Sequence, residues 1–161
     1  LVLDTYIPPR RRTRPEGFDE LEAAISLAAA IADALSRGEY IIDIFAAGPE
    51  LYTFRAGQNI AHLDNVLEIL SCVEACRKNP FDTLAPALAE EVANITTMIC
   101  VFLDWDESRQ HLVRMAEETG CVSRVVIVRQ GKTTAPLDTA GGARVTVVDP
   151  ASIRTGGVTQ L

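Results

Sequence analysis

Leu-Val-Leu-Asp-Thr, residues 1–5, is the stretch that decides the fold. Three apolar residues run directly into the carboxylate of Asp4. Pro8 and Pro9 then prevent further strand pairing, because proline has no amide hydrogen to donate. A continuous apolar run is typical of a strand that is covered on both faces. The stretch therefore predicts a central strand of an α/β sheet, with Asp4 at its carboxyl end.

A second stretch, residues 97–104, repeats the pattern as Thr-Met-Ile-Cys-Val-Phe-Leu-Asp. It is again a continuous apolar run that ends in an aspartate, Asp104. If the two strands are parallel neighbours, Asp4 and Asp104 meet at one crevice outside the carboxyl ends of the strands. Open α/β sheets place their sites in such crevices.

Strand and helix patterns alternate along the remaining chain. The predicted strands are residues 1–5, 40–46, 51–55, 97–104, 124–128 and 144–148. The predicted helices are residues 18–36, 59–76, a helix capped by Asp82 or Thr83 that runs to residue 93, and a helix from Asp106 or Ser108 to Gly120. We therefore expect one α/β domain over residues 1–161, with a doubly wound, mostly parallel six-stranded sheet. The strand at 51–55 should be antiparallel at one edge.

The bulk properties narrow the class of protein. A chain of 161 residues with 48% apolar residues can bury a sizeable core, and its net charge of −7 disfavours nucleic-acid binding through a basic face. The chain opens in mid-strand without a methionine or a signal peptide, so we expect a piece of a longer protein. Its most apolar helix, residues 21–35, is too short to span a bilayer. Any membrane anchor would lie in preceding sequence.

The order of elements resembles the von Willebrand factor type A (vWA) domain, a Rossmann-like fold. More narrowly, it resembles the vWA-like C-terminal region of the bacterial domain-of-unknown-function 58 family. The residues that carry this resemblance are Leu-Val-Leu-Asp at 1–4 and the alanine-rich helix that follows, with Tyr-Ile-Ile-Asp-Ile-Phe at 40–45 and Leu-x-x-Val-Leu-x-x-Leu at 63–70.

The resemblance implies a metal-ion-dependent adhesion site, which normally begins with Asp-x-Ser-x-Ser. Asp4 matches the first aspartate, but Tyr6 and Pro8 occupy the places of the two serines. Neither side chain supplies the compact hydroxyl that the motif uses. We therefore expect a degenerate site.

Two further motifs of the resembled site fall later in the chain. Asp82 stands where a threonine is usual, with Thr83 one place late. Asp104 matches the third-motif aspartate, followed by Trp105 where glycine is common. Two acids thus remain while the hydroxyl ligands are largely lost. We expect no cofactor, although Mg²⁺ is the cation that such oxygen ligands would take.

Asp4, Asp104 and Asp106 also permit a different class of function. Asp104-Trp-Asp106 resembles the Asp-x-Asp motif of nucleotide-sugar transferases, so one alternative is a metal-dependent enzyme acting on a phosphate ester or a nucleotide sugar. The simpler interpretation is that these acids bond backbone amides or cap helices. Two negative charges in one crevice are costly. One acid can be protonated, or a fixed cation of the protein can lie between the two acids, or water and helix-terminal amides can bond to both of them.

The loop after the first strand carries four arginines, Arg10, Arg11, Arg12 and Arg14. One of them could fold back over Asp4 and Asp104 as the fixed cation. The loop could also dock an acidic partner, bind phosphate or simply be solvated. As partner-binding residues we predict these arginines together with Trp105 and Asp106.

The resemblance implies a non-enzymatic protein–protein interaction domain. The family is bacterial and membrane-anchored, with the vWA domain in the cytoplasm. Genes of this family commonly lie beside those of MoxR-type AAA+ ATPases, so the expected partner is such an ATPase and the expected role is protein assembly or maturation. No nucleic-acid partner is expected, and the membrane would be reached only through preceding sequence.

Overall fold

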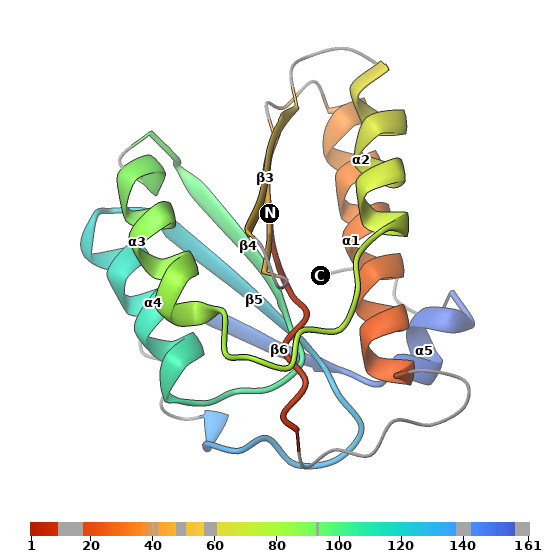
Figure 1. The fold of residues 1–161 in the computed structure, drawn as a ribbon, viewed down its shortest axis with the longest axis vertical. Coiled ribbons are helices and arrows are strands. Elements are labelled where there is room, and N and C mark those ends of the chain that lie inside the picture. The colour runs from red at the N-terminus through yellow and green to blue at the C-terminus, as the bar shows by residue number, and fades with distance from the viewer. Residues whose placement is uncertain are drawn as a thin grey trace.

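The computed structural model describes residues 1–9, 18–38, 40, 42–47, 51–56, 61–92, 94–137 and 143–156. Within these residues, strands and helices alternate along most of the chain (Figure 1). In chain order the elements are β1 (Val2–Asp4), α1 (Asp19–Arg37), β2 (Ile42–Ala47), β3 (Leu51–Ala56), α2 (Ala61–Ser71), α3 (Phe81–Val92), β4 (Thr97–Phe102), α4 (Glu107–Glu118), β5 (Val122–Val128), β6 (Arg144–Val148) and α5 (Pro150–Arg154).

The described strands form a six-stranded sheet in the order β3-β2-β1-β4-β5-β6. β1 pairs in parallel with both β2 and β4, so the opening stretch of the sequence lies in the middle of the sheet. β4, β5 and β6 continue in parallel, and β3 at the opposite edge runs antiparallel to β2. The predicted α/β class, with a parallel sheet flanked by helices, is confirmed.

Helices cover both faces of the sheet. In Figure 1, α1, α2 and α5 lie on one side of the sheet, and α3 and α4 lie on the other. Successive strand residues point to opposite faces, so each apolar strand contributes to two cores. The core under α1 takes Leu3, Val101 and Val126, and the core under α3 and α4 takes Val2, Cys100 and Ile127. Burial on both faces explains why these strands read as unbroken apolar runs.

The connection between α2 and α3 differs from the prediction. We expected a helix over residues 59–76, but α2 ends at Ser71. Cys76 instead forms a parallel bridge with Tyr6, just beyond β1. The amide of Cys76 donates to the carbonyl of Thr5, and the amide of Ile7 donates to the carbonyl of Cys76, both at 2.8 Å. These long-range bonds replace the helical bonds that the local periodicity favoured.

The start of α3 and the presence of α5 also differ from the prediction. Neither Asp82 nor Thr83 precedes α3, because this helix begins at Phe81 and the side chain of Asn79 accepts from the amide of Phe81 at 3.1 Å. The short helix α5 was not predicted. Its start is a common sequence signal, because the side chain of Asp149 accepts from the amide of Ala151 and a proline holds the first turn.

Among the described residues, no helix is both long enough and apolar enough to cross a bilayer.

Candidate functional site

Asp4, the last residue of β1, is fully buried. Its Oδ1 accepts a hydrogen bond from the amide of Tyr6 at 2.8 Å, and its Oδ2 accepts one from the amide of Leu103 at 2.9 Å. Leu103 directly follows β4, the parallel neighbour of β1. The carboxylate therefore joins the carboxyl ends of the two central strands.

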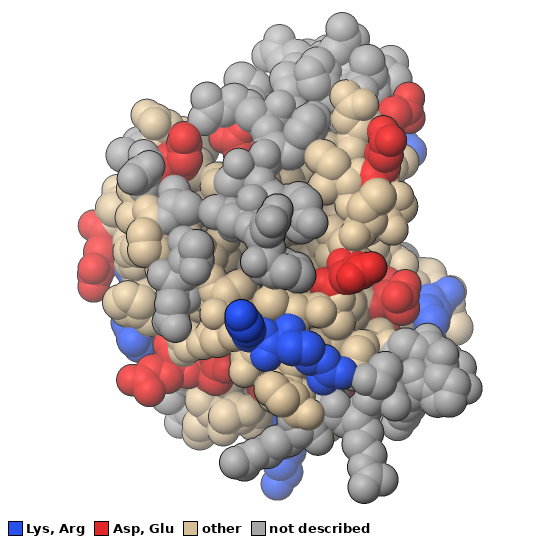
Figure 2. Space-filling model, viewed as in Figure 1, with Lys and Arg blue, Asp and Glu red and all other residues tan. Residues whose placement is uncertain are grey.

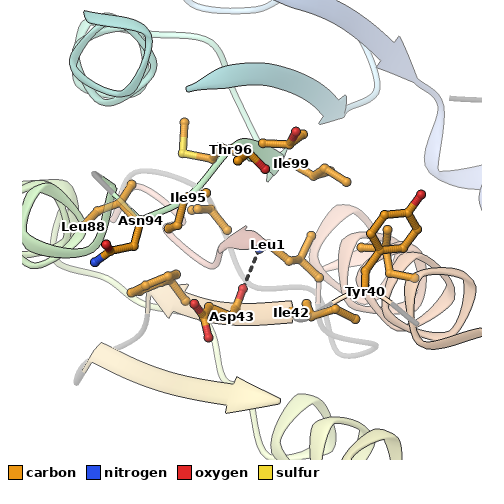
Figure 3. Close-up of a pocket in the computed structure, with 14 residues that line it drawn as sticks. Leu1, Tyr40, Ile42, Asp43, Leu88, Asn94, Ile95, Thr96 and Ile99 are labelled. Carbon is orange, nitrogen blue, oxygen red and sulfur yellow. Dashed lines mark hydrogen bonds between the residues drawn. The ribbon is translucent and has the colours of Figure 1, made fainter. Parts of the chain in front are cut away.

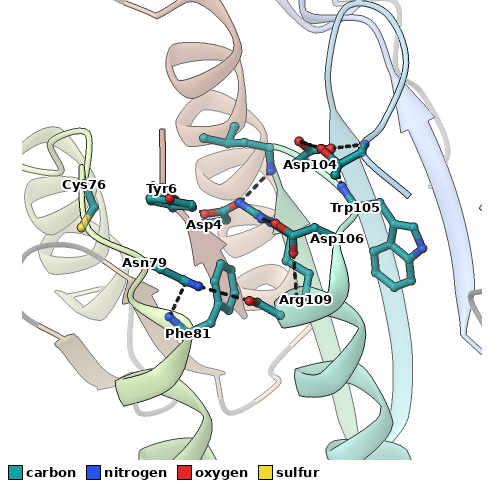
Figure 4. A network of polar contacts seen from close by, with 12 residues as sticks. Asp4, Tyr6, Cys76, Asn79, Phe81, Asp104, Trp105, Asp106 and Arg109 are labelled. Atoms are coloured by element: carbon teal, nitrogen blue, oxygen red, sulfur yellow. Dashed lines mark hydrogen bonds and ion pairs between the residues drawn. The ribbon is translucent and has the colours of Figure 1, made fainter. Parts of the chain in front are cut away.

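Arg109, in the first turns of α4, supplies the positive charge that faces Asp4 (Figure 4). Its Nε and Nη2 donate to Oδ2 of Asp4 at 2.8 and 2.6 Å. The Arg109 side chain is only 2% exposed, and its guanidinium carbon lies 4.8 Å from the centroid of the Phe81 ring. A buried carboxylate is costly unless it is paired and hydrogen-bonded, and here it is both.

Asp106 holds the other side of the same guanidinium. As the N-cap of α4, it accepts from the amide of Arg109 through Oδ1 at 3.1 Å and from Nη1 of Arg109 through Oδ2. Burial on its own lowers the pKa of Arg109, but the carboxylates of Asp4, Asp106 and Asp104 more than offset it and raise the pKa above its ordinary value. The guanidinium therefore stays charged.

Asp104 is held by a different arginine. Its Oδ1 accepts from the amides of Trp105 and Thr134, both at 2.8 Å, and its Oδ2 accepts from the hydroxyl of Thr134 at 2.7 Å. Nη1 of Arg129 lies 2.9 Å from Oδ2 and also donates to the carbonyl of Leu103 at 3.0 Å. Asp4 ends β1 and Asp104 lies two residues beyond the end of β4, the parallel neighbour of β1, yet each carboxylate has its own arginine.

The arrangement does not fit a divalent cation. Such a cation needs carboxylate and hydroxyl oxygens that converge on one point. Here every carboxylate oxygen of Asp4, Asp104 and Asp106 accepts from a fixed N–H or O–H donor, and Arg109 lies between two of these acids. In the part of the chain that the structure describes, no cluster of His, Cys, Asp and Glu could hold a metal ion.

Several predicted site residues lie outside the described part. Arg10, Arg11, Arg12 and Arg14 fall in the stretch 10–17, outside the described residues, so the expectation that one of them lies over Asp4 and Asp104 as a fixed cation stays a prediction. Among the described residues, Arg109 is the arginine that pairs with Asp4. The backbone of Asp82 and Thr83 lies in the first turn of α3, but their side chains are outside the described residues.

The structure corrects the prediction that Trp105 is a partner-binding residue. Its side chain is fully buried and packs against Phe102, with the ring centroids 6.5 Å apart. Figure 4 shows it turned away from the Asp4–Arg109 pair. A side chain that contributes to the core cannot also meet a partner in this arrangement. Asp106, also predicted at the partner surface, is 27% exposed and engaged by Arg109.

The sequence interpretation missed Arg109 and Arg129. A signal for Arg109 was present, because this residue opens the buried stripe of α4 that continues with Leu112, Val113 and Ala116. An arginine at the start of an apolar helical stripe must find buried partners. Arg129 follows β5 at its carboxyl end, the edge at which Asp4 and Asp104 were expected, so its position gave a comparable signal.

Basic side chains gather on the surface beside this site. Figure 2 shows them next to the connection between α2 and α3, which carries the exposed residues Arg77 and Lys78. Nη1 of Arg77 donates to the carbonyl of Pro8 at 3.4 Å, and its guanidinium carbon lies 5.0 Å from the centroid of the Phe18 ring. Arg77 is thereby fixed beside Pro8 and Pro9, immediately before the four-arginine stretch.

A cavity of about 710 Å³ lies at the starts of β1 and β4, at the end of these strands opposite to the carboxyl edge (Figure 3). Its lining includes residues 96–99 at the start of β4, together with Ile42, Asp43 and Leu88. The backbone nitrogen of Leu1 lies in it, 2.6 Å from the carbonyl oxygen of Asp43. Asp4, Asp104, Asp106 and Arg109 are not among its lining residues, so the cavity and the acidic crevice are separate features.

Comparison with known proteins supports the fold. No protein-family model and no curated protein matches the sequence. Among solved structures, the chain is similar to a von Willebrand factor type A protein from Catenulispora acidiphila, with a TM-score of 0.63 and 13% identity. The match covers 96% of this chain and 40% of that protein. At this identity the likeness establishes a vWA-like fold, and this chain spans less than half of the longer protein.

Proposed function

We propose that this chain is a non-enzymatic protein–protein interaction domain with a degenerate metal-ion-dependent adhesion site. The observation that carries the proposal is the pairing of Asp4 with Arg109, which gives the buried carboxylate a permanent partner at 2.6 Å. A vWA-like fold commonly mediates protein interactions. A site of this fold whose central acid already has a cation can present its surface without a metal ion.

The enzyme alternative has less support from the same geometry. A general acid or base must come within hydrogen-bond reach of its substrate. Asp4 is fully buried, and the side chain of Asp104 is 14% exposed and bonded to Arg129 and Thr134. Asp4 and Asp104, which would share the metal ion of such an enzyme, are each engaged by different donors. Binding to a partner is therefore the better use of this edge.

The partner surface proposed here is the carboxyl edge of the sheet. Arg10, Arg11, Arg12 and Arg14 follow Pro9 in the sequence, and Arg77 is fixed against Pro8. Asp106 contributes its exposed fraction at the start of α4. A surface that is locally basic on a chain of net charge −7 favours a partner with an acidic patch.

At a finer level, we propose a MoxR-type AAA+ ATPase as the partner and protein assembly or maturation as the role. This step rests on the resemblance of residues 1–4, 40–45 and 63–70 to the domain-of-unknown-function 58 family. The same resemblance motivates a cytoplasmic, membrane-anchored bacterial protein that takes no cofactor.

The test is calorimetric titration of the chain with a purified MoxR-type AAA+ ATPase in nucleotide-free buffer, with millimolar Mg²⁺ and with EDTA. We expect saturable binding of equal affinity in both buffers, because no metal ion takes part. Changing Arg10, Arg11, Arg12 and Arg14 to Ser should weaken it, and added salt should weaken it as well. Changing the exposed residues Arg37, Arg114, Arg124 and Arg144 to Ser removes the same charge elsewhere and serves as the control.

Two results would contradict the proposal. The first is binding that requires Mg²⁺ and disappears in Asp4→Asn, which would indicate a working metal site. The second is hydrolysis of p-nitrophenyl phosphate or of a nucleotide sugar that Mg²⁺ or Mn²⁺ supports and Asp4→Asn abolishes, which would favour the enzyme.

A further inference from the structure

Arg109 contacts three segments that converge at the carboxyl edge of the sheet. It donates to Asp4 at the end of β1 and to Asp106 at the start of α4, and its guanidinium lies over the ring of Phe81 at the start of α3. It also lies 5.8 Å from the centroid of the Tyr6 ring, beyond β1 (Figure 4). One side chain thus links the ends of a central strand and of two helices on one face.

The charges around Arg109 match this linking role. Asp4 and Asp106 bring two carboxylates to one guanidinium, and the remaining acceptor positions are met by the amides of Tyr6, Leu103 and Arg109 itself. Asp4 and Arg109 are both almost completely buried, so solvent screens their attraction little. Without the guanidinium, two carboxylates would face each other with only amides to stabilise them.

A divalent cation links two carboxylates in a different way from an arginine. It would attract them through its charge and hold them by coordination, and its occupancy would depend on the cation concentration. An arginine on a buried helix face is always present and always charged. Its planar donors also fix the directions from which the carboxylates approach.

We propose that Arg109 is the resident cation of this site. It holds the ends of β1, α3 and α4 in one arrangement, so that the carboxyl edge is preset and insensitive to divalent cations. The inference deepens the proposed interaction function, because it concerns how the same edge is held and regulated.

The experiment compares thermal melting of the wild-type chain and Arg109→Gln, in EDTA and in millimolar Mg²⁺, at constant ionic strength. The wild-type midpoint should be the same in both buffers. The Arg109→Gln midpoint should be lower by about 10 °C in both buffers, as expected for a broken buried ion pair in a domain of this size. Mg²⁺ should not restore it, because backbone amides still occupy the carboxylate oxygens of Asp4 and Asp106. The control is Arg114→Gln, at an exposed position of the same helix, which should change neither the midpoint nor its response to Mg²⁺.

A second comparison keeps the inference testable if Arg109→Gln does not fold. The double variant Asp4→Asn with Arg109→Gln removes both charges and keeps the approximate shapes. It should fold and melt at a higher temperature than Arg109→Gln alone, and Mg²⁺ should not affect it.

Three outcomes would overturn the inference. These are a wild-type midpoint that rises in Mg²⁺, an Arg109→Gln chain that melts like Arg114→Gln, and a double variant that melts no higher than Arg109→Gln. All of these measurements use the isolated chain. The inference can therefore fail while partner binding stands, and partner binding can fail while the inference stands.

Discussion

Arg109 is 105 residues away from Asp4 in the sequence, yet its Nε and Nη2 both donate to one oxygen of the Asp4 carboxylate. The acceptor, Oδ2, also receives the amide of Leu103, so a single oxygen collects three donors from α4 and from the end of β4. This concentration of donors stabilises the buried carboxylate at the carboxyl end of the central strand β1. It also predicts that the three acids of the crevice differ in their importance for stability.

Asp4→Asn should destabilise the protein far more than Asp106→Asn. The first substitution leaves the Arg109 guanidinium buried without its main partner, which typically costs about 3–5 kcal/mol. The second affects a side chain that is 27% exposed, and asparagine remains a good N-cap, so we expect a loss of about 1 kcal/mol. Urea unfolding at neutral pH measures both values. Equal losses of stability in the two variants would mean that the buried Arg109 side chain is not stabilised mainly by Asp4.

Thr134→Val should loosen the connection between β5 and β6 without unfolding the sheet. The hydroxyl of Thr134 donates to Asp104 at 2.7 Å, and its loss removes one hydrogen bond from an oxygen that keeps Arg129 as a partner, at a cost of about 0.5–1.5 kcal/mol. Hydrogen exchange at the amide of Ala135, which donates to the carbonyl of Trp105 at 2.7 Å, should become faster.

Thr146→Val is the matched control for this prediction, because Thr146 is exposed on β6. It should change the stability by less than about 0.5 kcal/mol and leave the exchange of Ala135 as it is. Unchanged exchange in Thr134→Val would contradict the role that we assign to the Asp104–Thr134 contact.

The four cysteines should differ sharply in their reactivity. Cys72 is exposed, whereas Cys76, Cys100 and Cys121 are buried. Burial raises the pKa of Cys100 to about 12, so very little of this thiol is ionised at neutral pH. Iodoacetamide should therefore modify Cys72 first in the native protein, with the site identified by mass spectrometry. Cys72→Ser should remove the fast phase, and rapid labelling of Cys100 would contradict the burial described here.

Stability should fall as the pH rises from about 9 to about 12. The thiol of Cys100 has a pKa near 9.0 in the unfolded chain and about 12 in the folded one, so the folded state keeps a proton that the unfolded state loses. Its contribution is complete below the lower value and decreases by up to about 1.4 kcal/mol per pH unit above it. Urea unfolding at several alkaline pH values should give a shallower decline for Cys100→Ala than for the wild type. Identical slopes would exclude this thiol as a cause.

The fold was largely predictable because its main signals are local. The apolar runs at 1–3 and 97–103 identify strands buried on both faces, and the stripe of the first long helix identifies α1. The end of α2 was not predictable in the same way, because residues 72–76 continue a helical pattern. The partner that holds Cys76 out of the helix is Tyr6, 70 positions earlier in the chain.

The acidic residues of the site were predictable from the sequence, but the arginines that pair with them were not. Asp4 and Asp104 are visible as the acids that end two apolar runs, and the parallel order of β1 and β4 brings these ends together. Which arginine pairs with each acid depends on how helices and loops pack over the carboxyl edge of the sheet. The nearby arginines in the sequence, residues 10–14, were therefore favoured over Arg109, which only the packing of α4 brings to Asp4.

The Asp4–Arg109 pair also bears on how the chain folds. Its two members lie near the start of the chain and well into its second half, so the contact forms only when β1 and α4 have met across the sheet. Before that contact forms, each charge is stabilised more by solvation in water than by burial in a crevice that lacks its partner. Partly assembled forms that bury one member alone are therefore disfavoured. The pair thus links the assembly of the two halves of the sheet, and contacts between residues this distant in the sequence are generally associated with slower folding.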